Sequence, residues 1–210
     1  MNIILIIVDA LRPDHLKING YKRDTSPNIG KLSEEGTYFL NAYCTLPRTD
    51  PTLTSIFTGM YPHNHGIRLV ANNQFNSSIT TLPEILQNHD YKTAYMNPDL
   101  HESAIEKGFL ESSLLKWRIK NKIKRIIYKI FNPRNFLGAT QQHAGIAVKW
   151  IKNNSNNKFF LCFHPTDLHW PYQPPHPYDN MYDPEYKGKH DFNMLKDGLL
   201  PRGDVLFGNI

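Results

Sequence analysis

Apolar residues along this chain form short, dense runs that alternate with stretches of helical periodicity. Three of these runs are rich in β-branched and aromatic residues, which is typical of strands buried on both faces of a sheet: residues 1–9, 91–96 and 159–163. A further strand is predicted at 37–43. Apolar spacing and end signals predict helices at 26–35, 82–86 and 139–152, and a short helix that ends at Thr58-Gly59.

Strands that alternate with helices predict an α/β fold with a largely parallel central sheet flanked by helices. In such sheets ligands bind at the carboxyl ends of the strands. Asp9 lies at that end of the first strand, and His164 and His169 follow the last one. We therefore expect the functional site at this edge of the sheet.

The composition supports a folded core and an anionic ligand. The chain has 210 residues, 40% of them hydrophobic, which argues against disorder. Its net charge of +5 favours an anionic substrate or surface without naming one. The two cysteines are far apart in sequence and indicate a reduced setting. The first apolar run is short, lacks basic residues and meets Asp9 at once, so we read a strand rather than a signal peptide or membrane span and expect a cytoplasmic protein.

A basic amphipathic helical insertion is predicted at 112–135. Isoleucines recur there at helical spacing among lysines and arginines. This segment either contacts an anionic membrane or polysaccharide surface, or is a solvated helix packed on the domain. No motif indicates nucleic-acid binding. Residues 170–210 are expected to form an irregular surface stretch, and the α/β domain looks unfinished at its end.

The stretch from Asn41 to Gly66 carries the densest chemistry. It contains Thr58-Gly59-Met60-Tyr61-Pro62-His63-Asn64-His65-Gly66. This resembles the nucleophile region of the sulfatase family, which belongs to the alkaline phosphatase superfamily and has the pattern C-x-P-S-R followed by T-G-x-Y-P-x-x-H-G. The family spacing implies that Thr49 stands at the nucleophile position, with Pro51 and Thr52 after it. Cys44 lies too far upstream of Thr58 to take that role.

A threonine nucleophile changes the expected mechanism. Sulfatases convert a cysteine or serine into a formylglycine hydrate, whose second hydroxyl expels the sulfate, and threonine does not fit that conversion. The resemblance still implies attack by the Thr49 oxygen, activated by a metal that it helps to bind. Threonine at this position also occurs in lipoteichoic acid synthases, phosphoethanolamine transferases and sulfatase-like proteins. A helix N-cap is the purely structural alternative for Thr49.

Asp9 matches the first metal ligand of the family. The segment Val8-Asp9-Ala10-Leu11-Arg12-Pro13-Asp14-His15-Leu16 resembles the family start V-D-x-L-R-x-D-H-L. A carboxylate at a strand end suits a hard divalent cation, and Ca, Mg, Mn and Zn all stay open. Many sulfatases have a second aspartate where this chain has Ala10.

Three further residues are expected to meet the substrate. The segment from Phe159 to Pro175 resembles the family's strand followed by D-P-H-x-P-Y-x-P-P, which implies that His169 contacts the transferred group or the leaving oxygen. His164 and Asn97 are assigned to substrate binding. Asn97 stands where many sulfatases have G-K-W-H, whose Lys-x-His pair is absent here.

The resemblance implies a sulfatase-like, metal-dependent hydrolase of sulfuric esters, of which this chain is the N-terminal part of the catalytic domain. Its substrate would be an anionic sulfate or phosphate ester. Two alternatives remain open. One is a phosphodiesterase or phosphotransferase with a threonine nucleophile. The other is a non-catalytic, truncated remnant that binds an anionic glycan or membrane surface.

Overall fold

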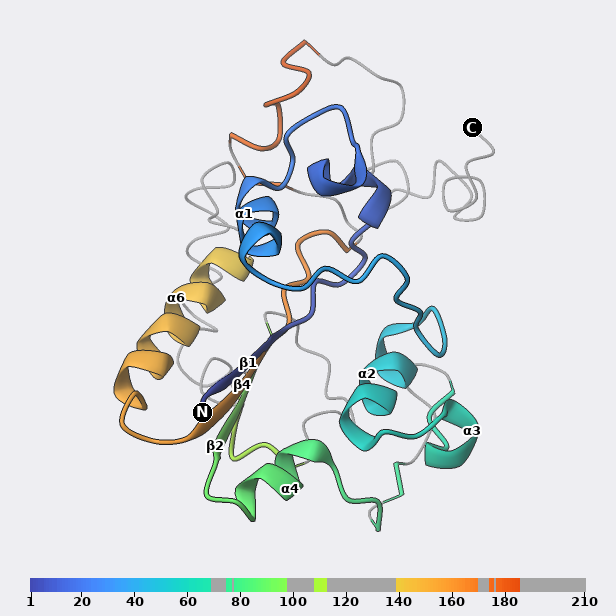
Figure 1. Cartoon of the computed structure of the whole chain (residues 1–210), viewed down its shortest axis with the longest axis vertical. Coiled ribbons are helices and arrows are strands. Elements are labelled where there is room, and N and C mark those ends of the chain that lie inside the picture. The colour runs from blue at the N-terminus through green and yellow to red at the C-terminus, as the bar shows by residue number, and fades with distance from the viewer. Residues whose placement is uncertain are drawn as a thin grey trace, which may run out of the picture.

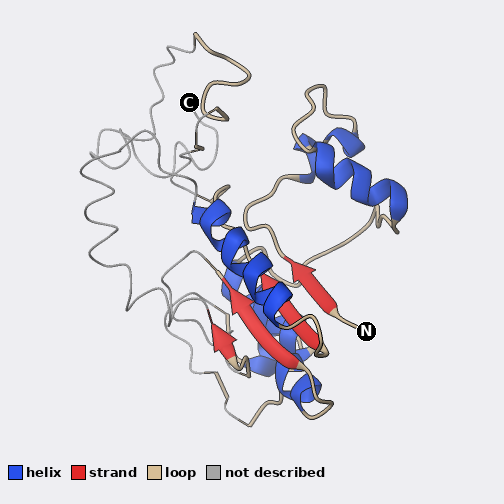
Figure 2. Ribbon diagram, turned by 90° about the vertical axis from the view of Figure 1, so that its left-hand side faces the viewer, coloured by secondary structure: helices blue, strands red, loops and turns tan. Residues whose placement is uncertain are grey.

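The computed structural model describes residues 1–68, 75–76, 78–97, 108–112, 139–169, 174–175 and 177–185. Its centre is a four-stranded sheet in the order β1-β4-β2-β3, and every pair of neighbours is parallel. The strands are β1 (Ile3–Ile6), β2 (Lys92–Met96), β3 (Glu111–Ser112) and β4 (Phe159–Phe163). Figures 1 and 2 show helices on both sides of this sheet. The predicted α/β fold with a parallel sheet is confirmed.

Most of the predicted helices are present in the described part of the chain, where α6 is the longest. The helical elements, with the two short 3-10 turns η1 and η2, are η1 (Pro13–His15), η2 (Lys17–Asn19), α1 (Pro27–Glu35), α2 (Thr49–Thr58), α3 (Pro62–His65), α4 (Leu82–Gln87) and α6 (Ala139–Asn153). A capping box between Thr81 and Glu84 starts α4, and Gly59 in the left-handed region ends α2. Helices α1, α2, α4 and α6 agree with the sequence prediction.

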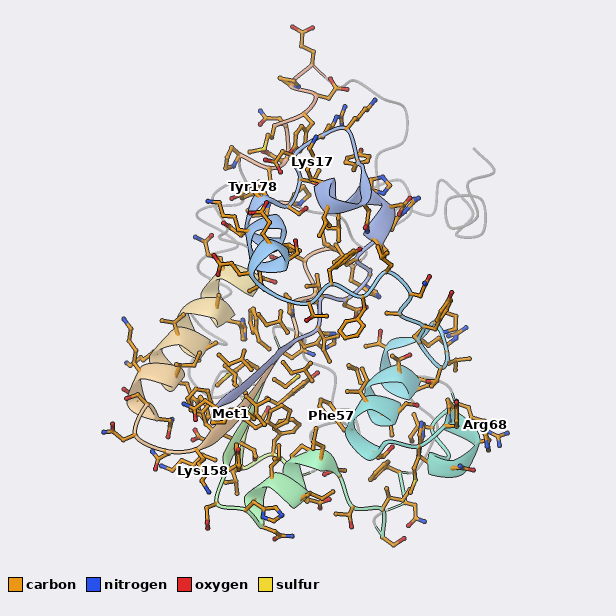
Figure 3. All side chains as sticks on the ribbon, in the orientation of Figure 1. Met1, Lys17, Phe57, Arg68, Lys158 and Tyr178 are labelled. Atoms are coloured by element: carbon orange, nitrogen blue, oxygen red, sulfur yellow. The ribbon has the colours of Figure 1, made fainter. Side chains whose placement is uncertain are left out.

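Alternating side chains of the central strands build a separate apolar core on each face of the sheet. On one face, Ala94 of β2 and Leu161 of β4 pack with Ala147 and Trp150 of α6. On the other face, Tyr95 and Phe160 pack with Leu53 and Phe57 of α2 and with residues of α4. Figure 3 shows the Phe57 side chain on the side of α2 that faces the sheet. Helix α2 is therefore fixed against the same face that carries Tyr95.

Strand β1 lies at one edge of the sheet. Its side chains alternate, so Ile3 and Leu5 pack against the core that contains α2, while Ile4 and Ile6 on the α6 face are 50% and 57% exposed. Within the described residues, β1 pairs with β4 alone. The carboxyl end of β1 therefore lies beside the carboxyl end of β4.

The prediction of a strand at 37–43 is wrong. The structure has an irregular segment there, in which Phe39, Leu40 and Tyr43 are 74%, 81% and 89% exposed. Aromatic and β-branched residues favour a strand only where a neighbouring edge can pair with it. None of the strands in the described part of the chain pairs with this segment.

Other sequence predictions lie largely outside the described residues. These are most of the basic segment 112–135 and most of the surface stretch 170–210. Among the residues that are described, no helix has the length and apolarity needed to cross a membrane. Cys44 is exposed and Cys162 is buried, and both are free thiols. Burial raises the pKa of Cys162 to about 12, so this cysteine is an inert part of the core.

Candidate functional site

The parallel register of β1 and β4 brings Asp9 and His164 together. Ile6 pairs with Phe163, and the ladder continues past both strands through hydrogen bonds from Ile7 N to the Phe163 oxygen and from Asp9 N to the Pro165 oxygen. The two side chains that follow the strands meet, and His164 Nε2 lies 3.5 Å from Asp9 Oδ2. Both residues thus stand at the carboxyl edge of the sheet, where sequence pattern placed the site.

Helix α2 brings Thr49 to the same carboxylate. Thr49 is the first residue of the helix and Arg48 is its N-cap, so the N-cap alternative for Thr49 is off by one position. The hydroxyl of Thr49 donates to Asp9, with its oxygen 3.2 Å from Oδ2 and 3.5 Å from Oδ1. Leu53 and Phe57 anchor α2 in the core, so the packing of the helix fixes the distance between Thr49 and Asp9.

His164 is held from its other side by residues of β2 and its end. Tyr95 Oη is 2.8 Å from His164 Nδ1, and Asn97 Nδ2 is 3.2 Å from the same nitrogen and 3.3 Å from Tyr95 Oη. The backbone N–H of His164 donates to the Met96 oxygen at 2.8 Å, which extends the β2–β4 pairing. His164 and Asn97 are 2% and 8% exposed. Both residues are buried, and substrate binding by them stays a prediction.

The surroundings of Asp9 favour its ionised form. The hydrogen bond from His164 lowers the pKa of Asp9 most, and it outweighs the opposing effect of burial. Electrostatic attraction to His164, the hydrogen bond from Thr49 and a contribution from His169 lower the pKa further. The carboxylate is therefore charged at neutral pH and ready to bind a cation.

His169 lies close enough to contribute to the Asp9 pKa, and its ring is on an exposed residue of the loop after β4. Its backbone N–H donates to the Thr166 oxygen at 2.9 Å. In the same loop Asp167 accepts a hydrogen bond from the Thr140 N–H at 3.3 Å, which ties the loop to the start of α6. Of the residues predicted for the site, His169 is the exposed member and faces a different environment from buried His164.

The donors gathered at Asp9 have the chemistry of a hard-cation site. A carboxylate and a hydroxyl oxygen are ligands that Ca²⁺ and Mg²⁺ prefer. Within the described part of the chain, however, no group of three or more His, Cys, Asp or Glu side chains gathers to hold a metal. Next to Asp9, Ala10 adopts φ 56°, in the left-handed region. By donor type, Asp9 and Thr49 fit a hard divalent cation.

Sequence reasoning missed a buried pair, Ser55 of α2 and His65 of α3. Ser55 Oγ is 3.0 Å from His65 Nε2, and Thr45 Oγ1 donates to Ser55 Oγ at 3.0 Å. His65 Nδ1 accepts a hydrogen bond from the Ile67 N–H at 3.1 Å, so the proton of a neutral ring is on Nε2. With its proton already there, His65 cannot take one from Ser55. The pair ties α2 to α3 and is structural rather than nucleophilic.

The burial of His65 is expected to make stability depend on pH. Burial lowers the pKa of His65 below its ordinary value, so the unfolded chain binds a proton more readily than the folded one. Its contribution to stability is complete above the ordinary histidine pKa and falls as pH drops below it, by at most about 1.4 kcal/mol for each pH unit. Urea unfolding from pH 7.5 down to 5 measures this loss. His65→Gln should flatten the curve, and an unchanged curve would contradict the assignment.

Comparison with known proteins gives both sequence and structural relatives. The Sulfatase family model matches residues 1–193. An arylsulfatase of Clostridium perfringens is 42% identical over 65 residues, which are 31% of this chain and 14% of that protein. An N-acetylglucosamine-6-O-sulfatase of Bacteroides thetaiotaomicron is 26% identical over 184 residues, covering 82% of this chain and 31% of that protein. The chain thus spans less than a third of the length of either relative.

Solved structures share the fold at low identity. A phosphonate monoester hydrolase of Agrobacterium radiobacter superposes with a TM-score of 0.70 at 16% identity, over 88% of this chain and 44% of that one. A protein in complex with its substrate D-glucosamine-2-N,6-O-disulfate superposes with a TM-score of 0.66 at 22% identity, over 83% of this chain and 36% of that one.

The parallel sheet flanked by helices is the α/β fold that these solved structures share. Because the family model covers residues 1–193 of the 210, the chain belongs to the sulfatase family.

Proposed function

We propose that this chain is part of the catalytic domain of a metal-dependent hydrolase that cleaves sulfuric esters, with Thr49 as its nucleophile. The observation that carries the proposal is the approach of Thr49 Oγ1 to within 3.2 Å of Asp9 Oδ2. A hydroxyl at the first turn of a helix, beside an ionised carboxylate at a strand end, combines a nucleophile with a cation ligand. The helix N-terminus also favours the negative charge of the ester group.

Asp9 and Thr49 are the described residues that would hold the metal. A bound divalent cation would lower the pKa of a coordinated hydroxyl and neutralise charge on the ester oxygens. Asp9 stays ionised because His164 and Thr49 both donate hydrogen bonds to it. The carboxylate also accepts the Thr49 hydroxyl hydrogen, which directs an oxygen lone pair away from Asp9.

The reaction then proceeds by two displacements at sulfur. The Thr49 oxygen forms a bond to sulfur as the bond from sulfur to the alcohol oxygen breaks, and the Thr49 proton passes to solvent. The departing alcohol oxygen receives a proton from His169, an exposed residue of the loop after β4, and His169 regains a proton from solvent. Water next attacks sulfur, the bond to Thr49 breaks and the hydroxyl is restored. One water is consumed, and an alcohol and hydrogen sulfate are released.

The identity of residue 49 favours a second candidate, hydrolysis or transfer at a phosphoric ester. Thr49 carries one hydroxyl and a methyl group, so its ester intermediate has no second hydroxyl that could expel the bound group. The intermediate must break by a further attack on the central atom. Phosphoryl groups undergo that step readily, whereas it is harder for a sulfate ester.

Paired substrates with one leaving group separate the two candidates. The full-length protein, loaded with Ca²⁺, Mg²⁺, Mn²⁺ or Zn²⁺ in turn, is assayed with 4-nitrophenyl sulfate and with the ethyl phosphodiester of 4-nitrophenol. Faster turnover of the sulfate supports the sulfuric ester hydrolase. Faster turnover of the phosphodiester moves the assignment to phosphoric esters. If neither ester is cleaved with any metal, a non-catalytic binding role replaces both.

A further inference from the structure

Tyr95 is a buried polar residue that the proposed mechanism has not used. Tyr95 belongs to β2 and is 1% exposed, and the centre of its ring lies 5.4 Å from the centre of the Phe109 ring. A buried tyrosine hydroxyl needs a hydrogen-bond partner, because leaving it unpaired costs about 1–3 kcal/mol. Here the partner is Nδ1 of His164, at 2.8 Å. The other nitrogen of that ring faces Asp9.

The arrangement around Nδ1 determines where the His164 proton lies. The Asn97 amide nitrogen is a donor only, and it stands 3.2 Å from Nδ1 and 3.3 Å from Tyr95 Oη. A proton on Nδ1 would oppose the protons of Asn97, so Nδ1 acts as an acceptor. Tyr95 then donates its hydroxyl hydrogen to Nδ1 while its oxygen accepts from Asn97.

With Nδ1 serving as an acceptor, the proton of the neutral imidazole is on Nε2. That N–H points at Asp9 Oδ2, 3.5 Å away. A tyrosine on β2, a histidine after β4 and a carboxylate after β1 therefore form one chain of hydrogen bonds across three neighbouring strands. Residues that hydrogen-bond to a metal ligand fix its orientation and affect affinity about 10–100-fold.

We propose that Tyr95 is a positioning residue that fixes the tautomer of His164 and, through it, the orientation of the Asp9 carboxylate. The effect on metal affinity rests on the proposed function, whereas the effect on the tautomer does not. Tyr95 acts through His164, whose Nδ1 its hydroxyl contacts at 2.8 Å. Its ring packs in the core beside Phe109 and Phe160, which fixes the position of the hydroxyl oxygen.

The test compares Tyr95→Phe with Tyr91→Phe in the full-length protein. Tyr91 lies just before β2 and packs against the same core cluster. The control therefore removes a tyrosine hydroxyl at the opposite end of the strand. Nitrogen NMR of isotope-labelled histidine distinguishes protonated from unprotonated Nδ1 and Nε2 in the metal-free protein. Calorimetric titration with Ca²⁺, Mg²⁺, Mn²⁺ and Zn²⁺ gives the affinities, and thermal unfolding shows that each variant is folded.

We expect wild type and Tyr91→Phe to show His164 protonated on Nε2. Tyr95→Phe should give a mixture of tautomers and metal affinity lower by about tenfold or more. An unchanged His164 spectrum in folded Tyr95→Phe overturns the proposal, and so does a changed spectrum with unchanged affinity. If wild type binds none of the four metals, the proposed function fails separately. The tautomer comparison then decides the role of Tyr95 on its own.

Discussion

Replacing Thr49 by alanine is expected to lower turnover about a thousandfold or more, while the protein stays folded. The substitution removes the hydroxyl that lies 3.2 Å from Asp9 Oδ2 and leaves the apolar anchors of α2, Leu53 and Phe57, in place. Thr49→Ser should retain much of the activity, because serine keeps the hydroxyl. Initial rates on the better of the two 4-nitrophenyl esters, with circular dichroism as a check on folding, measure both changes.

Cys44→Ala is the matched control for this prediction. Cys44 is exposed and free, and of the two cysteines it is the one nearer to Thr49 in sequence. We expect Cys44→Ala to keep wild-type rates, and mass spectrometry to find an unmodified cysteine in the native protein. Full activity in Thr49→Ala, or loss of activity in Cys44→Ala, would overturn the assignment of the nucleophile.

Asp9→Asn is expected to weaken divalent-metal binding and turnover by at least about 100-fold. The amide has nearly the same volume as the carboxylate but lacks its charge, so packing is preserved while the cation loses its counter-charge. The hydrogen bonds that lower the Asp9 pKa show that the surroundings are built for the anion. Metal affinity is measured by calorimetry, and turnover is followed with increasing metal concentration.

Asp14→Asn provides a control of the same chemistry in the same stretch of sequence. Asp14 is exposed and paired with Arg12 at 2.6 Å, and that pair lowers its pKa to about 2. An exposed ion pair contributes little to stability. We expect this variant to bind metal and turn over ester as wild type does. Equal losses of metal affinity and turnover in Asp9→Asn and Asp14→Asn would show that the net charge of the protein, and not Asp9 itself, determines metal binding.

The periodicity of the sequence predicted most of the described fold because the central strands β2 and β4 are buried on both faces. Dense apolar runs such as Phe159–Phe163 leave few other structures possible. The prediction of a strand at 37–43 failed because this segment is largely exposed. Residues there have strand-forming side chains, but pairing depends on a neighbouring edge, which is set by the whole fold.

The candidate site was predicted in part, through the residues that follow the strands. Asp9 and Thr49 were assigned from family spacing, and the structure brings their oxygens within 3.2 Å. Tyr95 could not be assigned in this way, because its partner His164 is remote in sequence and their contact depends on the β2–β4 register. A signal was present, since a tyrosine near the end of a fully buried strand must hydrogen-bond to something. Ser55 and His65 were hidden by the same dependence on tertiary packing.

The backbone at Ala10 favours residues other than alanine next to Asp9. Alanine is poorly suited to a φ of 56°, whereas aspartate and asparagine occupy that region several-fold more often. A second acidic group beside Asp9 could therefore be gained there with less conformational strain than the present alanine carries. A substitution at this single position would therefore change the charge of the site while β1, β4 and the helix that presents Thr49 remain unaltered.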